Sequence, residues 1–297
     1  MTTGKRNRKA FRIFCGFTIL LGAAVFTGCG KKDAEGSGDS EKSGGKESRE
    51  IDEKNWDGTV NISHGVKLEM VKVKVESQPV KAQEAATDVR PPDWKPSMPD
   101  LTEDFYIGKT EVTQAQWMAV MKRNVTTFAG NDLPAHFVKW SEAMEFCEKL
   151  NEQGKAPKGW KFTLPTETQW EYAARGGLRS KGYEYSGSDD IDEVAWYRGN
   201  SEAKMHPVGK KKANELGLYD MSGNASEWCL DDWQERISSL KAEFTREKEP
   251  DDVSREYAVR GGCWDSGEKT CLSTNRDCDC LSNDRVGFRL ALVPVSE

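Results

Sequence analysis

The segment that most constrains the fold is residues 214–228, with the sequence NELGLYDMSGNASEW. Its apolar positions follow neither a helical nor a strand period, so the segment predicts a specific loop. Gly223 permits backbone angles that other residues avoid, and Asp220 favours turns by bonding its own backbone. The spacing of Asp220, Gly223, Ala225 and Glu227 allows two carboxylates and two carbonyls to surround one hard cation such as calcium. A loop whose polar groups satisfy one another is the alternative interpretation.

Residues 1–28 have the form of an export signal. Five basic residues and no acidic one precede an apolar stretch at 13–26, and small residues then lead to Cys29. The stretch is too short to be a spanning helix with its own stop-transfer flank. Its end resembles a bacterial lipobox, although Phe26 stands where leucine is usual, and this resemblance implies a lipid anchor on Cys29. A plain signal peptide or an uncleaved anchor is the alternative; each places the folded part outside the cytoplasm.

Residues 29–56 consist largely of Gly, Ser, Lys, Glu and Asp, with almost nothing to bury. Such a composition cannot offset its own ordering entropy, so we expect a flexible tether. Removal of the signal takes away five positive charges, and the net charge falls from −6 to about −11. This acidic balance argues against nucleic acid and anionic lipid surfaces as partners. Residues 57–297 are long enough for one domain with a sizeable core.

Periodicity within this domain predicts a mixture of strands and helices. Residues 66–75 and 105–112 have strand patterns, and 113–121 has a capping threonine followed by helical spacing. Residues 140–150 form an amphipathic pattern, with Ser141 as the expected cap. Its inward positions are Ala143, Phe146, Cys147 and Leu150. Residues 162–174 predict a strand and a helix capped by Thr166 and Gln169. The chain is therefore predicted to be an α+β protein with a high loop content.

Five motifs occur in an order that resembles one known family. They are EVT at 111–113, LPTETQWEYAARG at 164–176, NELGLYDMSGN at 214–224, RGG at 260–262 and VGFR at 286–289. The pattern is similar to formylglycine-generating enzymes, also called sulfatase-modifying factors. The resemblance implies a variant C-type-lectin-like fold with low regular secondary structure. It also implies calcium at Asp220, Gly223, Ala225 and Glu227. One ion is expected rather than two, because the loop after Asn200 is short and lacks an expected aspartate.

The resemblance is weakest at the family's catalytic positions. Catalytic members hold copper(I) with two cysteines and oxidise a substrate cysteine to formylglycine. The second of these positions is Cys271, but the first is Ser266, and a serine hydroxyl is a poor ligand for copper(I). Cys263 stands in place of the family's active-site serine. Ser226 and Arg285 replace an expected tryptophan and asparagine. These departures lie in one site and favour a scaffold that kept the fold and lost the oxidase.

The cysteines leave alternatives open. Cys263 and Cys271 can form a shifted metal pair, whereas an exported domain usually oxidises such cysteines to disulfides. Six cysteines follow Cys29 and permit fifteen full pairings; they are Cys147, Cys229, Cys263, Cys271, Cys278 and Cys280. Only three histidines occur, at no ligand spacing, so an iron site of two histidines and a carboxylate has weak support. Hydrolase and phosphate-loop motifs are absent from the sequence.

Two functional hypotheses remain. The favoured one is a lipid-anchored, non-catalytic binding or scaffold module of the cell envelope, facing the periplasm or the cell exterior. Its expected partners are the bacterial membrane, through lipid on Cys29, and an envelope protein or glycan. The alternative is an oxidase that matures exported sulfatases, with Cys271 and Cys263 as its catalytic residues. Ser266 discriminates between them, because a copper(I) oxidase requires a thiolate at that position.

Overall fold

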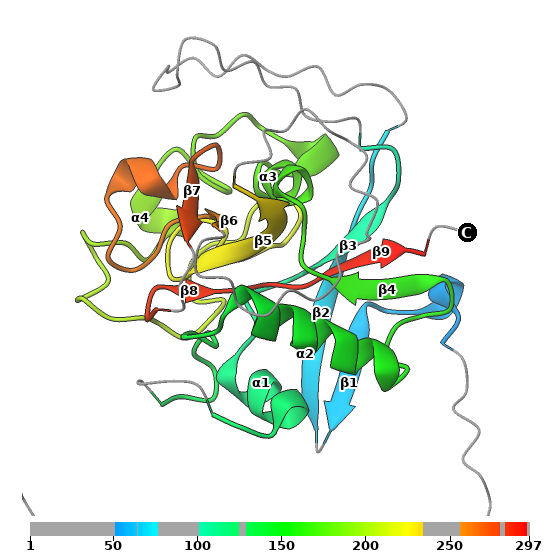
Figure 1. The fold of residues 1–297 in the computed structure, drawn as a ribbon. Helices are drawn as coiled ribbons and strands as arrows, with labels where there is room; N and C mark the ends of the chain where they lie inside the picture. The colour runs from blue at the N-terminus through cyan, green and yellow to red at the C-terminus, as the bar shows by residue number, and fades with distance from the viewer. Residues whose placement is uncertain are drawn as a thin grey trace, which may run out of the picture. The chain divides into compact units, whose positions relative to one another are not determined.

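The computed structural model describes residues 51–63, 65–76, 101–124, 129–233, 256–279 and 283–295. They belong to one compact unit, Glu47–Glu297. Two sheets and four α-helices organise the described chain, with long loops between them (Figure 1). The low content of regular structure confirms the expected α+β fold. No helix among the described residues combines the length and apolar character needed to cross a bilayer.

The first sheet joins the two ends of the domain. Its order is β1-β2-β3-β9-β4, and every neighbouring pair is antiparallel. The strands are β1 (Thr59–Ser63), β2 (Val66–Val73), β3 (Phe105–Gly108), β4 (Trp160–Thr163) and β9 (Ala291–Pro294). Because β9 lies between β3 and β4, the last strand of the chain closes the sheet that the first strands open (Figure 1).

The second sheet has the order β7-β6-β5-β8. Its strands are β5 (Ser226–Asp232), β6 (Tyr257–Arg260), β7 (Arg276–Asp279) and β8 (Val286–Gly287). The β5–β8 pair is parallel and the other two pairs are antiparallel. The chain passes from β8 in this sheet to β9 in the first through Phe288, Arg289 and Leu290, all of which are buried. The VGFR motif is therefore the connection between the two sheets.

The helices follow their capping signals with one exception. Thr113 and Gln116 cap α1 (Gln114–Met121), and Thr166 and Gln169 cap α3 (Glu167–Ala174), as the sequence predicts. The amphipathic α2 (Trp140–Glu152) buries Ala143, Phe146, Cys147 and Leu150, as predicted. The prediction that Ser141 caps α2 is wrong. The helix begins earlier because the Glu142 carboxylate accepts the backbone N–H of Lys139 at 2.9 Å.

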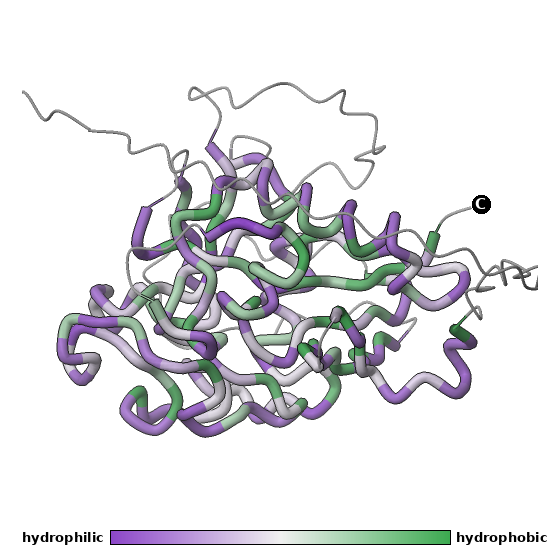
Figure 2. Tube along the Cα trace, turned by 90° about the horizontal axis from the view of Figure 1, so that it is seen from below, coloured by the Kyte–Doolittle hydropathy of each residue, from purple (hydrophilic) through white to green (hydrophobic). Residues whose placement is uncertain are grey.

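The remaining helices are short. α4 spans Ile191–Val194, and single 3-10 turns cover η1 (Glu53–Asn55), η2 (Gly177–Arg179) and η3 (Glu268–Cys271). Helices α1 and α2 contact each other, and they contact β2 and β4 of the first sheet, respectively. Helix α3 contacts β5 and β6 of the second sheet. The peripheral loops are largely hydrophilic (Figure 2), and the core between the elements contains Trp117, Phe146 and Phe288.

The end of the expected tether packs on the domain. Lys158 donates its backbone N–H to the Ile51 carbonyl at 3.0 Å, and the Tyr106 hydroxyl donates to Glu53 at 2.7 Å. The Trp56 and Tyr106 ring centroids are 5.0 Å apart. Residues 51–56, which composition assigned to the tether, therefore contact the first sheet. Cys29 and the signal segment lie outside the described residues.

Candidate functional site

The loop of residues 214–228 is fixed at its start by Asn214. The side-chain amide of Asn214 donates to the carbonyls of Ala173 and Ala174 at the end of α3, at 2.9 and 3.3 Å. Its oxygen accepts the backbone N–H groups of Leu216 and Leu218. One side chain thereby ties the loop to a helix end and sets its first turn, which explains why an asparagine suits this position.

The middle of the loop requires the residues found there. Gly223 has a φ of 79°, and a Cβ at this position would lie 2.3 Å from the carbonyl oxygen of Trp196. Asp220 and Asn224 also have positive φ values, of 56° and 63°, which Asp and Asn tolerate better than most residues. These backbone angles turn the Asp220 side chain and Ala225 into the buried interior. The predicted loop is confirmed by this geometry.

Glu227 and Arg289 form a buried ion pair beneath the loop. Both side chains are fully buried, and the two Glu227 oxygens accept from Arg289 Nε at 2.5 Å and Nη2 at 2.6 Å. Trp170 Nε1 adds a third hydrogen bond to Glu227 at 2.6 Å. Arg289 also donates to the carbonyls of Gly108 and Tyr219. The guanidinium therefore joins β3, the loop and β5 at one point.

Glu111 and Asp220 lie beside this pair and contact each other. Glu111 Oε1 accepts from Asn224 Nδ2 at 2.9 Å, and Asp220 Oδ2 accepts from the Gly209 N–H at 2.6 Å. Burial raises the pKa of Glu111 well above its usual range, and the neighbouring charges of Asp220 and Glu227 add to this effect. Burial also raises the pKa of Asp220 to about 6. Three carboxyl groups thus converge around one guanidinium.

The calcium set expected from the sequence is only partly assembled. Asp220, Gly223, Ala225 and Glu227 are all buried, but both Glu227 oxygens are used by Arg289 and Trp170. Among the described residues, no three His, Cys, Asp or Glu side chains are arranged to hold a metal ion. Two buried oxygens in this region, Glu111 Oε2 and Asp220 Oδ1, have no hydrogen-bond donor. Calcium at Asp220, Gly223, Ala225 and Glu227 therefore stays a prediction, and Arg289 and Trp170 already occupy the Glu227 carboxylate.

The Asn200 side chain, at the position where a second cation loop would begin, forms local hydrogen bonds. Its side-chain oxygen accepts the backbone N–H of Tyr197 at 3.0 Å, and its amide donates to Asp192 and to the Ala195 carbonyl, each at 3.0 Å. The amide group thereby caps a local turn and ties it to α4.

The cysteine positions form a second candidate site at the end of the RGG motif. Cys263 Sγ lies 3.3 Å from Ser266 Oγ, and the Cys263 N–H donates to the same hydroxyl at 2.9 Å. A Cβ on Gly262 would lie 3.0 Å from Cys271 Sγ, so Cys271 packs against the glycine that precedes Cys263. The predicted site residues are therefore neighbours. No described cysteine forms a disulfide; they are Cys147, Cys229, Cys263, Cys271 and Cys278.

Both thiols of this site are buried and favour the protonated form. Burial raises the pKa of Cys263, and the hydrogen bond from Ser266 opposes this shift. Burial raises the pKa of Cys271 to about 12, and the proximity of Cys263 adds to it. The thiolate is the form of cysteine that attacks electrophiles and binds soft metals. Both thiols are therefore expected to be weak nucleophiles in the folded protein.

Charged residues lie beside Cys263. Arg285 Nη2 lies 2.7 Å from an Asp265 carboxylate oxygen, and Arg198 Nη2 donates to the Asp265 carbonyl at 2.6 Å. The side chains of Arg198 and Arg285 are 67% and 54% exposed, so both can contact a partner. The Ser226 N–H donates to the Arg285 carbonyl, which places two of the sequence departures side by side.

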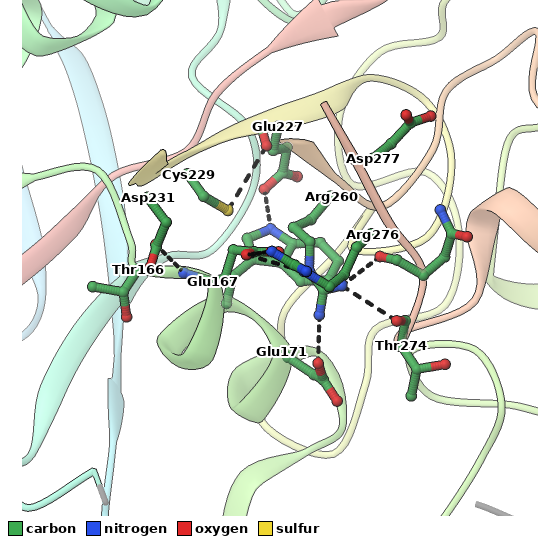
Figure 3. Close-up of polar contacts among 12 residues, drawn as sticks. Thr166, Glu167, Glu171, Glu227, Cys229, Asp231, Arg260, Thr274, Arg276 and Asp277 are labelled. Atoms are coloured by element: carbon green, nitrogen blue, oxygen red, sulfur yellow. Dashed lines mark hydrogen bonds and ion pairs between the residues drawn. The ribbon is translucent and has the colours of Figure 1, made fainter. Parts of the chain in front are cut away.

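A largely buried network of ion pairs connects the RGG motif to α3. Arg260 pairs with Glu171 at 2.5 Å and donates to the Asn275 carbonyl, while Arg276 pairs with Glu167 (Figure 3). Both glutamates belong to α3, and Asp231 accepts the Glu167 N–H at 2.6 Å. The network anchors β6 and β7 to α3. Sequence reasoning did not identify Glu111, Trp170 or Arg289 as site residues, although each belongs to one of the five motifs.

Comparisons with known proteins agree with the family expected from the motifs. Residues 48–293 match the model of the sulfatase-modifying factor enzyme 1-like domain. A chaperone protein LppX of Paenibacillus barcinonensis is 40% identical over 42% of this chain and 61% of its own length. An inactive C-alpha-formylglycine-generating enzyme 2 of Bos taurus is 31% identical over 54% of this chain and 50% of its own length. The chain thus spans less than two thirds of these relatives.

The fold has a close counterpart among solved structures. The Treponema denticola variable protein 1 superposes with a TM-score of 0.61, at 24% identity, over 80% of this chain and 98% of its own. This likeness concerns the fold alone.

Proposed function

The chain belongs to the sulfatase-modifying factor enzyme 1-like domain family, and on that premise we propose that it is a non-catalytic binding module of the bacterial cell envelope. A lipid on Cys29 would hold it at a membrane, facing the periplasm or the cell exterior. Its partner would be an envelope protein. The observation that carries the proposal is the pairing of Cys263 with Ser266, at 3.3 Å, where an oxidase needs a second thiolate.

The chemistry of the site supports this proposal. Ser266 uses its hydroxyl to accept the Cys263 N–H, which is a structural role in a turn. Burial raises the pKa of both Cys263 and Cys271, so both sulfurs favour the thiol over the thiolate. Copper(I) binding by two thiolates would need both to be deprotonated. Because position 266 offers a serine hydroxyl instead of a second thiolate, the residues at the two family positions do not fit copper(I), and no oxidative step is derived for them.

The relatives support a protein partner. One similar protein is named as a chaperone and another as an inactive member of the formylglycine-generating group. The exposed guanidiniums of Arg198 and Arg285 provide a polar contact surface beside the site. An acidic chain is a poor ligand for nucleic acid. The chaperone name of one relative favours a protein over a glycan as the partner.

The oxidase remains the second candidate, because Cys263 places one sulfur beside the Ser266 position and Cys271 lies close by. Mass spectrometry of a sulfatase-type cysteine peptide incubated with the full chain, copper(I) and oxygen separates the two. We expect no conversion by the native chain. Conversion would establish an oxidase and would make Cys263 the replacement ligand.

A photocrosslinking experiment tests the binding role directly. A crosslinker at Arg198 or Arg285 should capture one envelope protein in living cells. A crosslinker at Met118, which is 42% exposed on α1, serves as the control and should not capture it. Equal capture from all three positions would reject this surface as the binding face.

A further inference from the structure

Two exposed guanidiniums share one carboxylate beside the turn of residues 263–266. Asp265 Oδ1 lies 3.3 Å from Arg198 Nε, and Asp265 Oδ2 lies 2.7 Å from Arg285 Nη2. Each carboxylate oxygen therefore contacts a different arginine. Within the described part of the chain, no other carboxylate lies within ion-pair distance of either guanidinium. Two positive charges and one negative charge leave this group with a formal charge of +1.

Backbone contacts hold the two arginines in place. The Arg198 N–H donates to the Ser266 carbonyl at 3.0 Å, and the Arg285 N–H donates to the Asn283 side chain at 2.8 Å. Arg198 Nη2 also donates to the Asp265 carbonyl at 2.6 Å. Because these positions are set before a ligand arrives, binding costs less conformational freedom.

Part of each guanidinium remains available to a ligand. Asp265 contacts Nε and Nη2 of Arg198 and Nη2 of Arg285. Among the described residues, no acceptor contacts Nη1 of Arg198, or Nε and Nη1 of Arg285. The arginine side chains are 67% and 54% exposed, whereas Asp265 is 30% exposed. The shared carboxylate is therefore less accessible than the donors that flank it.

We propose that this pair binds an acidic peptide segment of the partner protein, with one carboxylate of the segment between Arg198 and Arg285. A planar guanidinium matches a carboxylate through two parallel N–H donors. A second carboxylate changes the formal charge of the group from +1 to 0 and offsets the repulsion between the two neighbouring positive charges. The inference rests on the proposed binding function and names the chemistry of its partner.

Fluorescence anisotropy of labelled hexaglutamate, titrated with the full chain at low ionic strength, tests the pair. The chain has a net charge of −6, so the molecule as a whole repels this probe. We expect saturable binding that weakens as salt is added. Arg198→Gln and Arg285→Gln should each weaken it at least about threefold. Arg123→Gln removes another exposed arginine that pairs with a carboxylate, and this control should bind as the native chain does.

The variant Asp265→Asn gives the most specific result. It removes the carboxylate that competes with the ligand for both guanidiniums, so hexaglutamate should bind at least about threefold more tightly. A misfolded variant would not bind more tightly, so this outcome does not depend on a loss. Unchanged or weaker binding by Asp265→Asn would overturn the inference, because the three side chains would then serve only to stabilise the turn.

Two further comparisons separate this inference from the proposed binding function. If native chain does not bind hexaglutamate, but crosslinkers at Arg198 and Arg285 still capture an envelope protein, the acidic segment is rejected and the binding role stands. If hexaglutamate binds and nothing is captured, the chemistry of the pair is supported and the envelope partner is rejected. A heparin hexasaccharide that binds where hexaglutamate does not would overturn the peptide in favour of a sulfated glycan.

Discussion

Cys263 Sγ and Ser266 Oγ lie 3.3 Å apart across a tight turn, in which the Ser266 N–H donates to the Cys263 carbonyl at 2.9 Å. The serine hydroxyl also accepts the Cys263 N–H. The residue that a copper oxidase would use as a ligand is thus part of the turn. A sulfur at position 266 would face Cys263 directly, which makes this pair the most informative place to alter the chemistry.

Substitution Ser266→Cys should create a soft-metal site. A second thiol beside Cys263, with Cys271 close by, offers the ligands that copper(I) prefers. Competition with a colorimetric copper(I) chelator should show at least about tenfold tighter binding than in the native chain. Ser266→Ala is the matched control and should bind no better than the native chain. Tight binding by the native chain would contradict the proposed loss of the oxidase.

The buried thiols should resist alkylation. Because burial raises the pKa of Cys271 to about 12, almost none of its sulfur is thiolate at pH 8. Cys263 is similarly shielded, whereas Cys278 is partly exposed. Mass spectrometry after brief iodoacetamide treatment should therefore find Cys278 modified before Cys263 and Cys271. All three should react in denaturant, and rapid labelling of native Cys271 would show an activated thiolate.

Loss of Arg289 should be severely destabilising. Arg289→Met leaves Glu227 buried without its ion-pair partner, which costs about 3–5 kcal/mol of unfolding free energy. Urea denaturation measures this cost. The control Lys149→Met breaks an exposed i,i+4 pair with Glu145 and should change stability by less than about 0.5 kcal/mol. Similar effects of the two substitutions would mean that the buried pair has little energetic weight.

Asp231 should make stability depend on pH between about 4 and 6. Burial raises the pKa of Asp231 to about 6, well above the ordinary value for an aspartate, so the folded state favours the protonated form. Its stabilising contribution is complete below the unfolded pKa and is lost as the pH rises through the folded pKa. Asp231→Asn keeps an acceptor for the Glu167 N–H but cannot ionise.

The effect of Asp231→Asn should therefore grow with pH. Relative to the native chain, the variant should gain up to roughly 3 kcal/mol as the pH rises from about 4 to above 6. Urea denaturation at pH 4, 5, 6 and 7 measures the difference between the two proteins, so other titrating groups cancel. A pH-independent difference would show that Asp231 has an ordinary pKa.

Substitution Cys29→Ala should release the chain from membranes. If lipid on this residue is the anchor, the native chain partitions into the detergent phase and the variant into the aqueous phase. Radiolabelled fatty acid should label only the native chain. Ser37→Ala, in the same segment, is the control and should partition as the native chain does. Membrane retention of Cys29→Ala would instead indicate an uncleaved apolar anchor.

Local features of the fold were predictable from the sequence. The capping pairs Thr113/Gln116 and Thr166/Gln169 lie three residues apart, and the inward face of α2 follows a helical period. The positive φ of Gly223 was expected because glycine permits it. The N-terminal cap of α2 was wrongly placed at Ser141. A serine near the start of a helical pattern is only one of the groups that can cap a helix, and here the Glu142 carboxylate does so.

The site itself depends on contacts that the sequence does not reveal. Glu227 and Arg289 are 62 positions apart, and Glu111 and Asn224 are 113 apart. The expected calcium ligands were chosen from one short loop, where spacing can be judged. Which carboxylate faces Arg289, and which is left without a donor, depends on how β3, β5 and the β8–β9 connection pack together.

The sequence by itself determined the family, the loop backbone, the caps of α1 and α3 and the absence of a thiol at position 266, because each depends on residue type over a few neighbouring positions. The tertiary structure alone decided that Glu227 pairs with Arg289 and that Glu111 joins Asp220. The physical reason is that charge compensation in a buried interior depends on distances in space. Those distances are fixed only when the last strand closes the first sheet.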